Sequence, residues 1–245
     1  MSTVGNIKNM HYDFKQKLNK LDSNAYRGLQ IPEIDRKLNE ALNLYILLIA
    51  QPRIKNQLGI ETSQRTIDDI SILVVDDYEC TLNADIANVT AELPTDYMYY
   101  LSTEYLLCSK DECKLQRFKT FVIQHDDNAN QQIFYKPSFD WRETTIRFFD
   151  DGIKVYTNGE FTVDKFTINY IKQHPYMHNA DDFANGTYYL PNNVGLSGYQ
   201  DCLLPDYTHQ EIVDLAVLIA TGDLESQISY QFKQNKLQLT QLKLQ

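Results

Sequence analysis

Pairs of acidic residues are the first candidates for chemistry in this sequence. Two carboxylates, or a histidine oriented by a carboxylate, can act as general acid and base. Such pairs include Asp76-Asp77, Asp126-Asp127 beside His125, Asp150-Asp151 and Asp181-Asp182. Adjacent residues on a strand point to opposite faces, so a sequential pair rarely converges on one substrate atom. We therefore interpret Asp150-Asp151 as part of a hairpin turn and the segment 125–128 as an exposed loop.

A second candidate is the histidine pair His174 and His178. Histidines four residues apart share one face of a helix and could bind a metal there. Pro175 lies between them and interrupts a helix. We interpret both as surface histidines that follow a strand.

The cysteines offer a weak metal signal. Cys108 and Cys113 are close in sequence, but no second pair with metal-ligand spacing accompanies them. The other two cysteines, Cys80 and Cys202, lie far apart. We expect free buried thiols and no disulfide framework. Calcium loops, phosphate-binding loops and hydrolase motifs are also missing from the sequence. The sequence therefore predicts no catalytic residue, no bound metal and no cofactor.

Charge and hydropathy exclude further classes. The net charge of −10 argues against a protein that holds nucleic acid by neutralising phosphates. The longest apolar run, Leu44 to Ala50, is too short to cross a bilayer. The segment Met1 to Met10 lacks the basic-then-apolar order of a secretory signal. We expect a soluble chain that remains in the cytoplasm where it is made, with no membrane partner.

Three segments have helical periodicity. Phe14, Leu18 and Leu21 predict a short helix over 10–21. A stronger helix should begin at Pro32 and end near Pro52, with its apolar stripe at Ile34, Leu38, Leu42, Tyr45 and Ile49. A third should follow a capping box formed by Thr208 and Glu211 and end at Gly222.

Strand-forming residues dominate the middle of the chain. Many of the 17 tyrosines and 11 phenylalanines lie between Tyr97 and Tyr189, and such residues favour a half-buried pleated surface. Between Thr144 and Ile171, the dipeptides Asp151-Gly152 and Asn158-Gly159 are typical of tight type I′ turns. They predict a three-stranded antiparallel meander, which residues 166–170 should extend by a fourth strand.

These elements predict an α+β protein: a helical pair, an antiparallel β-rich body with the meander Thr144–Ile171, and a C-terminal helix. We expect an N-terminal helical region over 1–70 and the β-rich body over 71–204. The C-terminal helix and tail, 205–245, should pack back on the N-terminal helices. The Gln-rich end, Gln231 to Gln245, is too small to fold alone and should order against a neighbour.

Three separated stretches carry a family resemblance. The first joins Leu21-Asp22-Ser23-Asn24 to the segment from Pro32 to Ala41, which contains Leu38-Asn39-Glu40-Ala41. The second is Glu92-Leu93-Pro94-Thr95-Asp96-Tyr97, and the third runs from Cys202 to Val217 through Leu204-Pro205 and His209 to Ala216. Residues 135–141 and the predicted meander match in order and spacing. Across roughly residues 20–230 the chain resembles the virion ring or neck proteins of crAss-like and related podoviruses that infect Bacteroidetes bacteria.

The resemblance implies a non-catalytic subunit of a ring, commonly a dodecamer, between the portal and the tail. Its partners would be further copies of itself, the portal protein and other ring or tail proteins, assembled in the host cytoplasm and carried in the virion. Genomic DNA would pass through the ring without specific binding. Acidic charge fits that role, because a negative wall gives a polyanion few adhesive contacts.

A second hypothesis is a tail-associated glycan-binding module or glycan-processing enzyme. The many tyrosines and the single tryptophan, Trp141, could form a platform on which sugars stack. For Trp141 we expect core packing beside Phe139, since large aromatic residues dominate burial in β-rich proteins.

Overall fold

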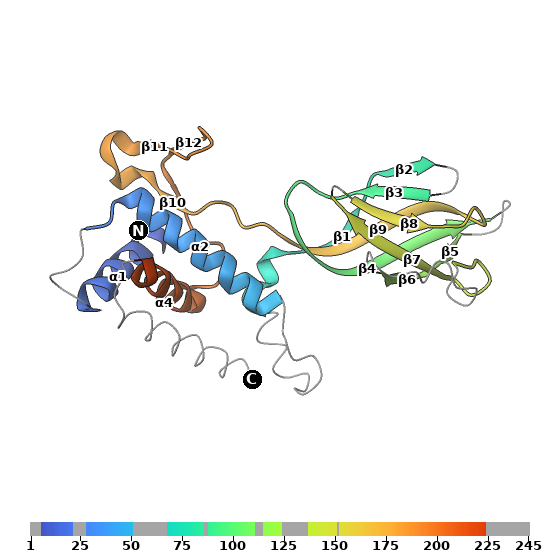
Figure 1. Ribbon diagram of the computed structural model, residues 1–245, viewed down its shortest axis with the longest axis horizontal. Helices are drawn as coiled ribbons and strands as arrows, with labels where there is room; N and C mark the ends of the chain where they lie inside the picture. Colours follow the sequence, from blue (N-terminus) through green and yellow to red (C-terminus); the bar gives the residue numbers. More distant parts are fainter. Residues whose placement is uncertain are drawn as a thin grey trace, which may run out of the picture. The chain divides into compact units, whose positions relative to one another are not determined.

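The computed structural model describes residues 6–21, 28–50, 68–85, 88–110, 115–123, 137–150 and 152–223. The chain divides into two compact units (Figure 1). We call Met1–Ile72 together with His174–Gln245 the helical unit, and Leu73–Gln173 the β unit. The β unit is therefore an insertion into the sequence of the helical unit. The α+β class is confirmed.

Among its described residues, the body of the helical unit is formed by α1 (Asn6–Leu21), α2 (Ile31–Ala50) and α4 (Asp206–Asp223). The apolar stripe predicted for α2 is buried along its whole length. On α1 the buried residues Ile7, Met10, Phe14 and Leu18 recur every three or four positions, which places them on one face. Helix α4 contacts both α1 and α2.

Helix α4 begins at Asp206, three residues before the first helical position that the capping box predicts. Thr208 lies inside its first turn, and its hydroxyl donates a 2.8 Å hydrogen bond to the carbonyl oxygen of Pro205. The side chain is therefore engaged with a carbonyl, and the predicted N-cap at Thr208 is wrong.

Residues 174–204, which we expected in the β-rich body, belong to the helical unit. They form short elements: β10 (His178–Asn179), η4 (Ala180–Asp182), η5 (Ala184–Gly186), β11 (Thr187–Tyr189), β12 (Gly195–Ser197) and β13 (Tyr199–Gln200). β10 pairs with β13, and β11 pairs with β12. The segment contacts the helices because its buried residues, Met177 and Ala180 among them, lie against α1 and α2.

The described part of the β unit forms two sheets. A short 3-10 helix, η1 (Ser71–Leu73), precedes the first strand. One sheet has the order β1 (Val74–Glu79), β9 (Thr162–Lys172), β4 (Tyr97–Ser109), β5 (Gln116–Arg117). The other has the order β2 (Leu82–Asp85), β3 (Asn88–Glu92), β8 (Gly152–Tyr156), β7 (Glu143–Phe149), β6 (Lys119–Val122). All pairs are antiparallel except β6 with β7.

The core of the β unit lies between these sheets. Leu106, Phe166 and Ile168 come from the first sheet, and Ile146 and Ile153 from the second; all five are fully buried in one cluster. Alternate residues of each strand supply this core, as expected for two sheets packed face to face. The β unit is therefore a β-sandwich.

The meander is confirmed in its first half and wrong in its second. β7 and β8 form a hairpin in which Phe149 pairs with Gly152, so Gly152 belongs to the strand. Asn158 and Gly159 adopt left-handed φ values of 51° and 71°, yet the following strand, β9, pairs in the opposite sheet. The connection spans residues 157–161, and buried Phe161 lies in the core between the sheets. The predicted third and fourth strands are one continuous strand.

Candidate functional site

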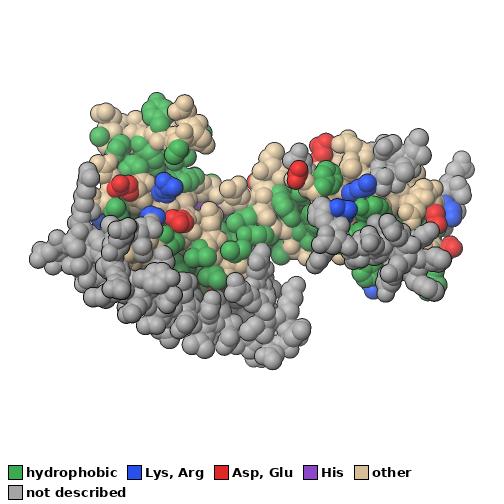
Figure 2. All heavy atoms as spheres, viewed as in Figure 1, with side chains coloured by type: hydrophobic (Ala, Val, Ile, Leu, Met, Phe, Trp, Pro, Cys, Tyr) green, Lys and Arg blue, Asp and Glu red, His purple; other side chains and the backbone are tan. Residues whose placement is uncertain are grey.

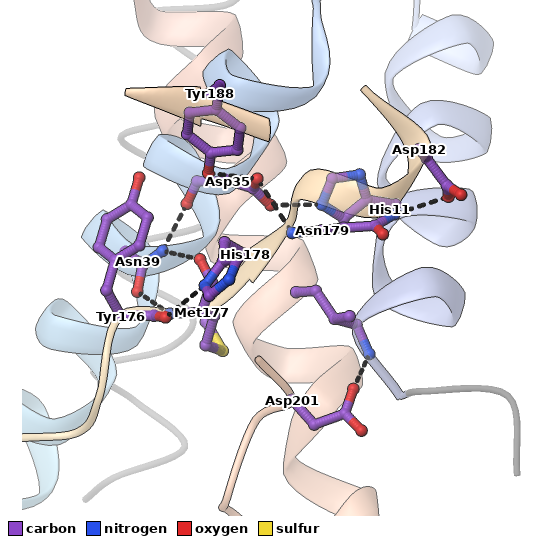
Figure 3. Close-up of polar contacts among 11 residues, drawn as sticks. His11, Asp35, Asn39, Tyr176, Met177, His178, Asn179, Asp182, Tyr188 and Asp201 are labelled. Atoms are coloured by element: carbon purple, nitrogen blue, oxygen red, sulfur yellow. Dashed lines mark hydrogen bonds and ion pairs between the residues drawn. The ribbon is translucent and has the colours of Figure 1, made fainter. Parts of the chain in front are cut away.

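A fully buried carboxylate, Asp35, lies at the centre of the helical unit (Figure 3). It projects from the apolar face of α2. Its Oδ1 accepts a 2.7 Å hydrogen bond from Nε2 of His11, which lies on α1. Its Oδ2 accepts one from the hydroxyl of Tyr188 at 2.7 Å and one from the backbone N–H of Asn179 at 3.2 Å. Three donors thus compensate a charge that burial alone would strongly disfavour.

Asn39, one helical turn after Asp35, holds the neighbouring backbone. Its amide nitrogen donates to the carbonyl oxygen of Met177 at 2.7 Å, and its amide oxygen accepts from the N–H of Met177 at 2.9 Å. The side-chain amide therefore pairs with this residue as a peptide group of an adjacent strand would. The same nitrogen also donates to the carbonyl oxygen of Asp35.

Asp35, His11, Tyr188, Asn39 and Asn179 together form what we call the buried polar network. It ties α1 and α2 to β10 and β11, although these elements lie far apart in the sequence. Burial first, and then the hydrogen bond to Asp35, raises the pKa of Tyr188 well above its usual range. The hydroxyl therefore keeps its proton and remains a donor.

A buried histidine beside a carboxylate also occurs in catalytic sites. Here the carboxylate has no exposed surface, and both of its oxygens are engaged with protein donors. Among the described residues, His11 Nδ1 is buried without a hydrogen-bond partner. The arrangement is suited to holding four elements in register rather than to proton transfer with a substrate.

The sequence did not predict this network, but it contains a signal for it. Asp35 and Asn39 lie four residues apart, directly beside Ile34 and Leu38 of the predicted apolar stripe. Polar residues at helical spacing next to a buried stripe indicate a satisfied buried group. Their partners, Asn179 and Tyr188, lie in a region without periodicity, so no pattern pointed to them.

The acidic pairs occupy separate places. Asp76 and Asp77 are exposed on β1, where Asp77 has a φ of 55° and the register with β9 shifts. Asp150 is exposed at the end of the β7–β8 hairpin. His125, Asp126 and Asp127 lie outside the described residues.

Asp181 and Asp182 lie on η4 at the edge of the buried polar network. Asp182 accepts a 2.7 Å hydrogen bond from the side chain of Asn179 and forms a 3.3 Å ion pair with Lys8 on α1. The bond from Asn179, followed by the contact with Lys8, lowers the pKa of this carboxyl despite partial burial. The pair supports the fold locally and does not converge on a common point.

The two histidines of the predicted pair bond to backbone. Nε2 of His174 accepts from the N–H of Leu203 at 2.8 Å, and its Nδ1 lies against the carbonyl oxygen of Pro175. Nδ1 of His178 lies 3.2 Å from the carbonyl oxygen of Tyr176, and Nε2 of the same ring lies 3.3 Å from that of Ser197. His174 is buried, so the expectation of two surface histidines is wrong for this one, because Leu203 packs its amide against the ring.

Cys80, Cys108 and Cys202 are free and buried, as predicted. Burial raises the pKa of Cys80 and of Cys108 to about 12 and that of Cys202 to about 11. Cys113 lies outside the described residues. Among the described side chains, no three of the His, Cys, Asp or Glu type could jointly hold a metal ion.

Trp141 is 80% exposed, and the expectation that it packs in the core is wrong. Phe139 fills that place instead: its ring lies 5.5 Å from that of Phe118 and 6.4 Å from that of Phe161. Trp141 follows in the turn before β7, which directs it to the surface. The tryptophan is therefore available to a partner.

The sequence matches no protein-family model and no curated protein sequence. None of the described helices combines the length and the apolar character that a membrane span requires.

Proposed function

We propose that this protein is a non-enzymatic structural subunit of a tailed-phage virion, forming a ring at the junction between portal and tail. The ring is a homo-oligomer, with twelve copies as the expected number, and it contacts the portal protein and other ring or tail proteins. Genomic DNA passes through it without specific binding. The resemblance of three separated sequence stretches to crAss-like ring proteins supports this proposal.

The observation that carries it is the exposure of large aromatic side chains on both units. Trp141 of the β unit is 80% exposed and Tyr189 of the helical unit is 75% exposed. Other large side chains are exposed as well: Tyr12, Leu101, Phe121, Val122, Val194, Tyr199 and Tyr207. Exposed aromatic residues are enriched at protein interfaces. A subunit with neighbours on several sides needs such surfaces on each of its units.

The acidity of the chain supports a ring through which DNA passes. A chain of net charge −10 offers a polyanion few attractive contacts. DNA that must leave the head quickly should meet such a surface rather than clustered lysine and arginine.

Native mass spectrometry of the full-length chain, alone and together with the portal protein, tests the proposal. We expect a closed oligomer that binds the portal ring, and cryo-electron microscopy of the virion should show it there. A chain that stays monomeric at all concentrations and never joins portal or tail proteins would contradict the ring.

A second candidate, a tail-associated glycan-binding module, is favoured by the exposure of Trp141 alone. An indole ring in the open can stack on a sugar. A glycan array with the wild-type chain and the Trp141→Ala variant decides between the two. Carbohydrate binding that Trp141→Ala abolishes, while assembly is intact, would support the glycan module; no binding by the wild-type chain would remove it. A turnover assay on the same glycans tests a glycan-processing enzyme.

A further inference from the structure

The segment from Phe183 to Gln200 contains no charged residue in 18 consecutive positions, although charged residues make up 23% of the chain. It forms η5, β11, β12 and β13 of the helical unit. Four of its residues are aromatic: Phe183, Tyr188, Tyr189 and Tyr199. We call it the uncharged segment. In Figure 2 hydrophobic side chains lie among uncharged atoms where the β11–β12 hairpin projects.

Most of this segment is exposed despite its composition. Tyr189, Val194 and Tyr199 are exposed large side chains. Pro191, Asn192 and Asn193 at the hairpin tip are exposed as well. An exposed, projecting surface in an acidic protein would ordinarily carry charge, which favours solubility. Depletion of charge together with enrichment in aromatic residues is typical of the centre of a protein–protein interface.

The hairpin has a defined shape. The N–H of Leu190 donates to the carbonyl oxygen of Val194 at 2.9 Å, and the N–H of Asn193 donates to the carbonyl oxygen of Leu190 at 2.9 Å. Asn193 adopts a left-handed φ of 61°, which asparagine tolerates. The ring of Tyr189 lies across Gly195, where a Cβ atom would be 3.1 Å from Cε1. A surface that is already ordered loses little conformational entropy when a partner binds.

The buried polar network holds the base of the hairpin. Tyr188 pairs with Leu196 across the hairpin, and its hydroxyl donates to Asp35. Its ring also meets that of Phe183 edge to face, at 5.8 Å between centroids. Tyr188 thus points into the helical unit while Tyr189, the next residue, points out. The hydrogen bond between Tyr188 and Asp35 of α2 therefore also fixes the position of the exposed Tyr189.

We propose that the uncharged segment binds a second copy of this chain. Two copies of net charge −10 repel one another, so a stable contact between them needs a surface that brings no further charge together. The uncharged segment provides such a surface, with aromatic and aliphatic side chains to bury. This inference rests on the proposed ring and names the contact through which copies associate.

Analytical ultracentrifugation of the full-length chain over a range of concentrations tests the contact. Tyr189→Asp places a charge at the centre of the segment without entering the buried core, and Val194→Asp does so at the hairpin tip. The matched control is Leu115→Asp, which places the same charge at an exposed apolar residue of the β unit. We expect each hairpin variant to weaken self-association at least about tenfold, which is about 1.4 kcal/mol. The control should associate like the wild-type chain.

Circular dichroism should show the same helix and strand signal for all four proteins, which separates lost association from lost folding. If Tyr189→Asp and Val194→Asp still assemble like the wild-type chain, the hairpin contact is wrong and the ring stands. If the wild-type chain self-associates through the hairpin but never binds the portal protein, the ring at the portal is wrong and the hairpin contact stands. A wild-type chain that is always monomeric overturns both.

Discussion

The hydroxyl of Tyr188 lies 2.7 Å from Oδ2 of Asp35, across 153 positions of sequence. This bond connects the β11–β12 hairpin to the buried face of α2, within the first two turns of that helix. Because Asp35 also binds His11 of α1, one carboxylate fixes the hairpin relative to two helices. Substitution of Asp35 should therefore destabilise the whole helical unit.

Asp35→Ala should destabilise the helical unit severely. The change leaves the donors of His11, Tyr188 and Asn179 without their acceptor, and breaking a buried pair in this way costs about 3 to 5 kcal/mol. Urea denaturation measures the free energy of unfolding. Glu40→Ala, on the exposed side of the same helix, is the control and should change it by less than about 0.5 kcal/mol. Equal stability of the two variants would show that Asp35 is not a structural centre.

Tyr188→Phe isolates one bond of the network. The ring that packs on Phe183 remains, but the donor to Asp35 is lost, so we expect a loss of about 1 to 3 kcal/mol. Tyr189→Phe is a closely matched control, since the same atom is removed from the adjacent, exposed residue. It should leave the melting temperature unchanged. A similar shift for both variants would contradict the assignment of the inward and outward tyrosines.

Gly152→Ala should destabilise the β unit. Gly152 begins β8, and a Cβ there would lie 2.5 Å from the backbone oxygen of Ala91 on the neighbouring strand β3. Backbone must shift to make room, and overpacking of this kind costs about 1 to 3 kcal/mol. Gly28→Ala, where nothing lies within 4 Å of the added atom, should be neutral. Thermal unfolding of both variants checks the difference.

Stability should fall in alkaline solution. Burial raises the pKa of Cys80 from 9.0 to about 12 and that of Cys108 likewise, with the charge of Asp164 adding to the effect at Cys108. Above pH 9 the unfolded chain releases these protons while the folded chain keeps them, so the free energy of unfolding declines as the pH rises toward 12. Below pH 9 the contribution of these thiols is fully present.

Urea denaturation at a series of pH values checks this decline. The Cys80→Ala/Cys108→Ala double variant should show a smaller fall over the same range, although it is less stable at neutral pH. An identical pH profile in both proteins would mean that these thiols do not cause the effect.

The sequence predicted what local patterns encode. The stripe from Ile34 to Ile49 has the period of a helix with one buried face, and that face is buried. Asp-Gly at 151–152 marks a turn between two strands, and β7 and β8 pair there. Each of these features depends on residues within one or two turns of each other, so periodicity and turn chemistry suffice to find them.

Features that depend on distant partners escaped prediction. Asn158 and Gly159 adopt a left-handed backbone. The same dipeptide can close a hairpin within one sheet or connect strands of two sheets. Here the chain passes to the other sheet, and Phe161 is buried in the core between the sheets. Trp141 and Phe139 are both large and apolar, and the residues beside them in the sequence do not distinguish the two. Only the tertiary structure shows that Phe139 packs against Phe118 and Phe161. The acceptor of Tyr188 lies on a helix near the other end of the chain.

The insertion of the β unit has a consequence for the order in which the chain folds during synthesis. All strands of the β-sandwich lie between Val74 and Lys172, so the ribosome releases this unit whole before α4 exists. Helices α1 and α2 must wait for α4, their packing partner, and closing that long loop carries an entropic cost. We expect the β-sandwich to fold cotranslationally, while the helical unit and its hairpin become complete only after α4 has emerged.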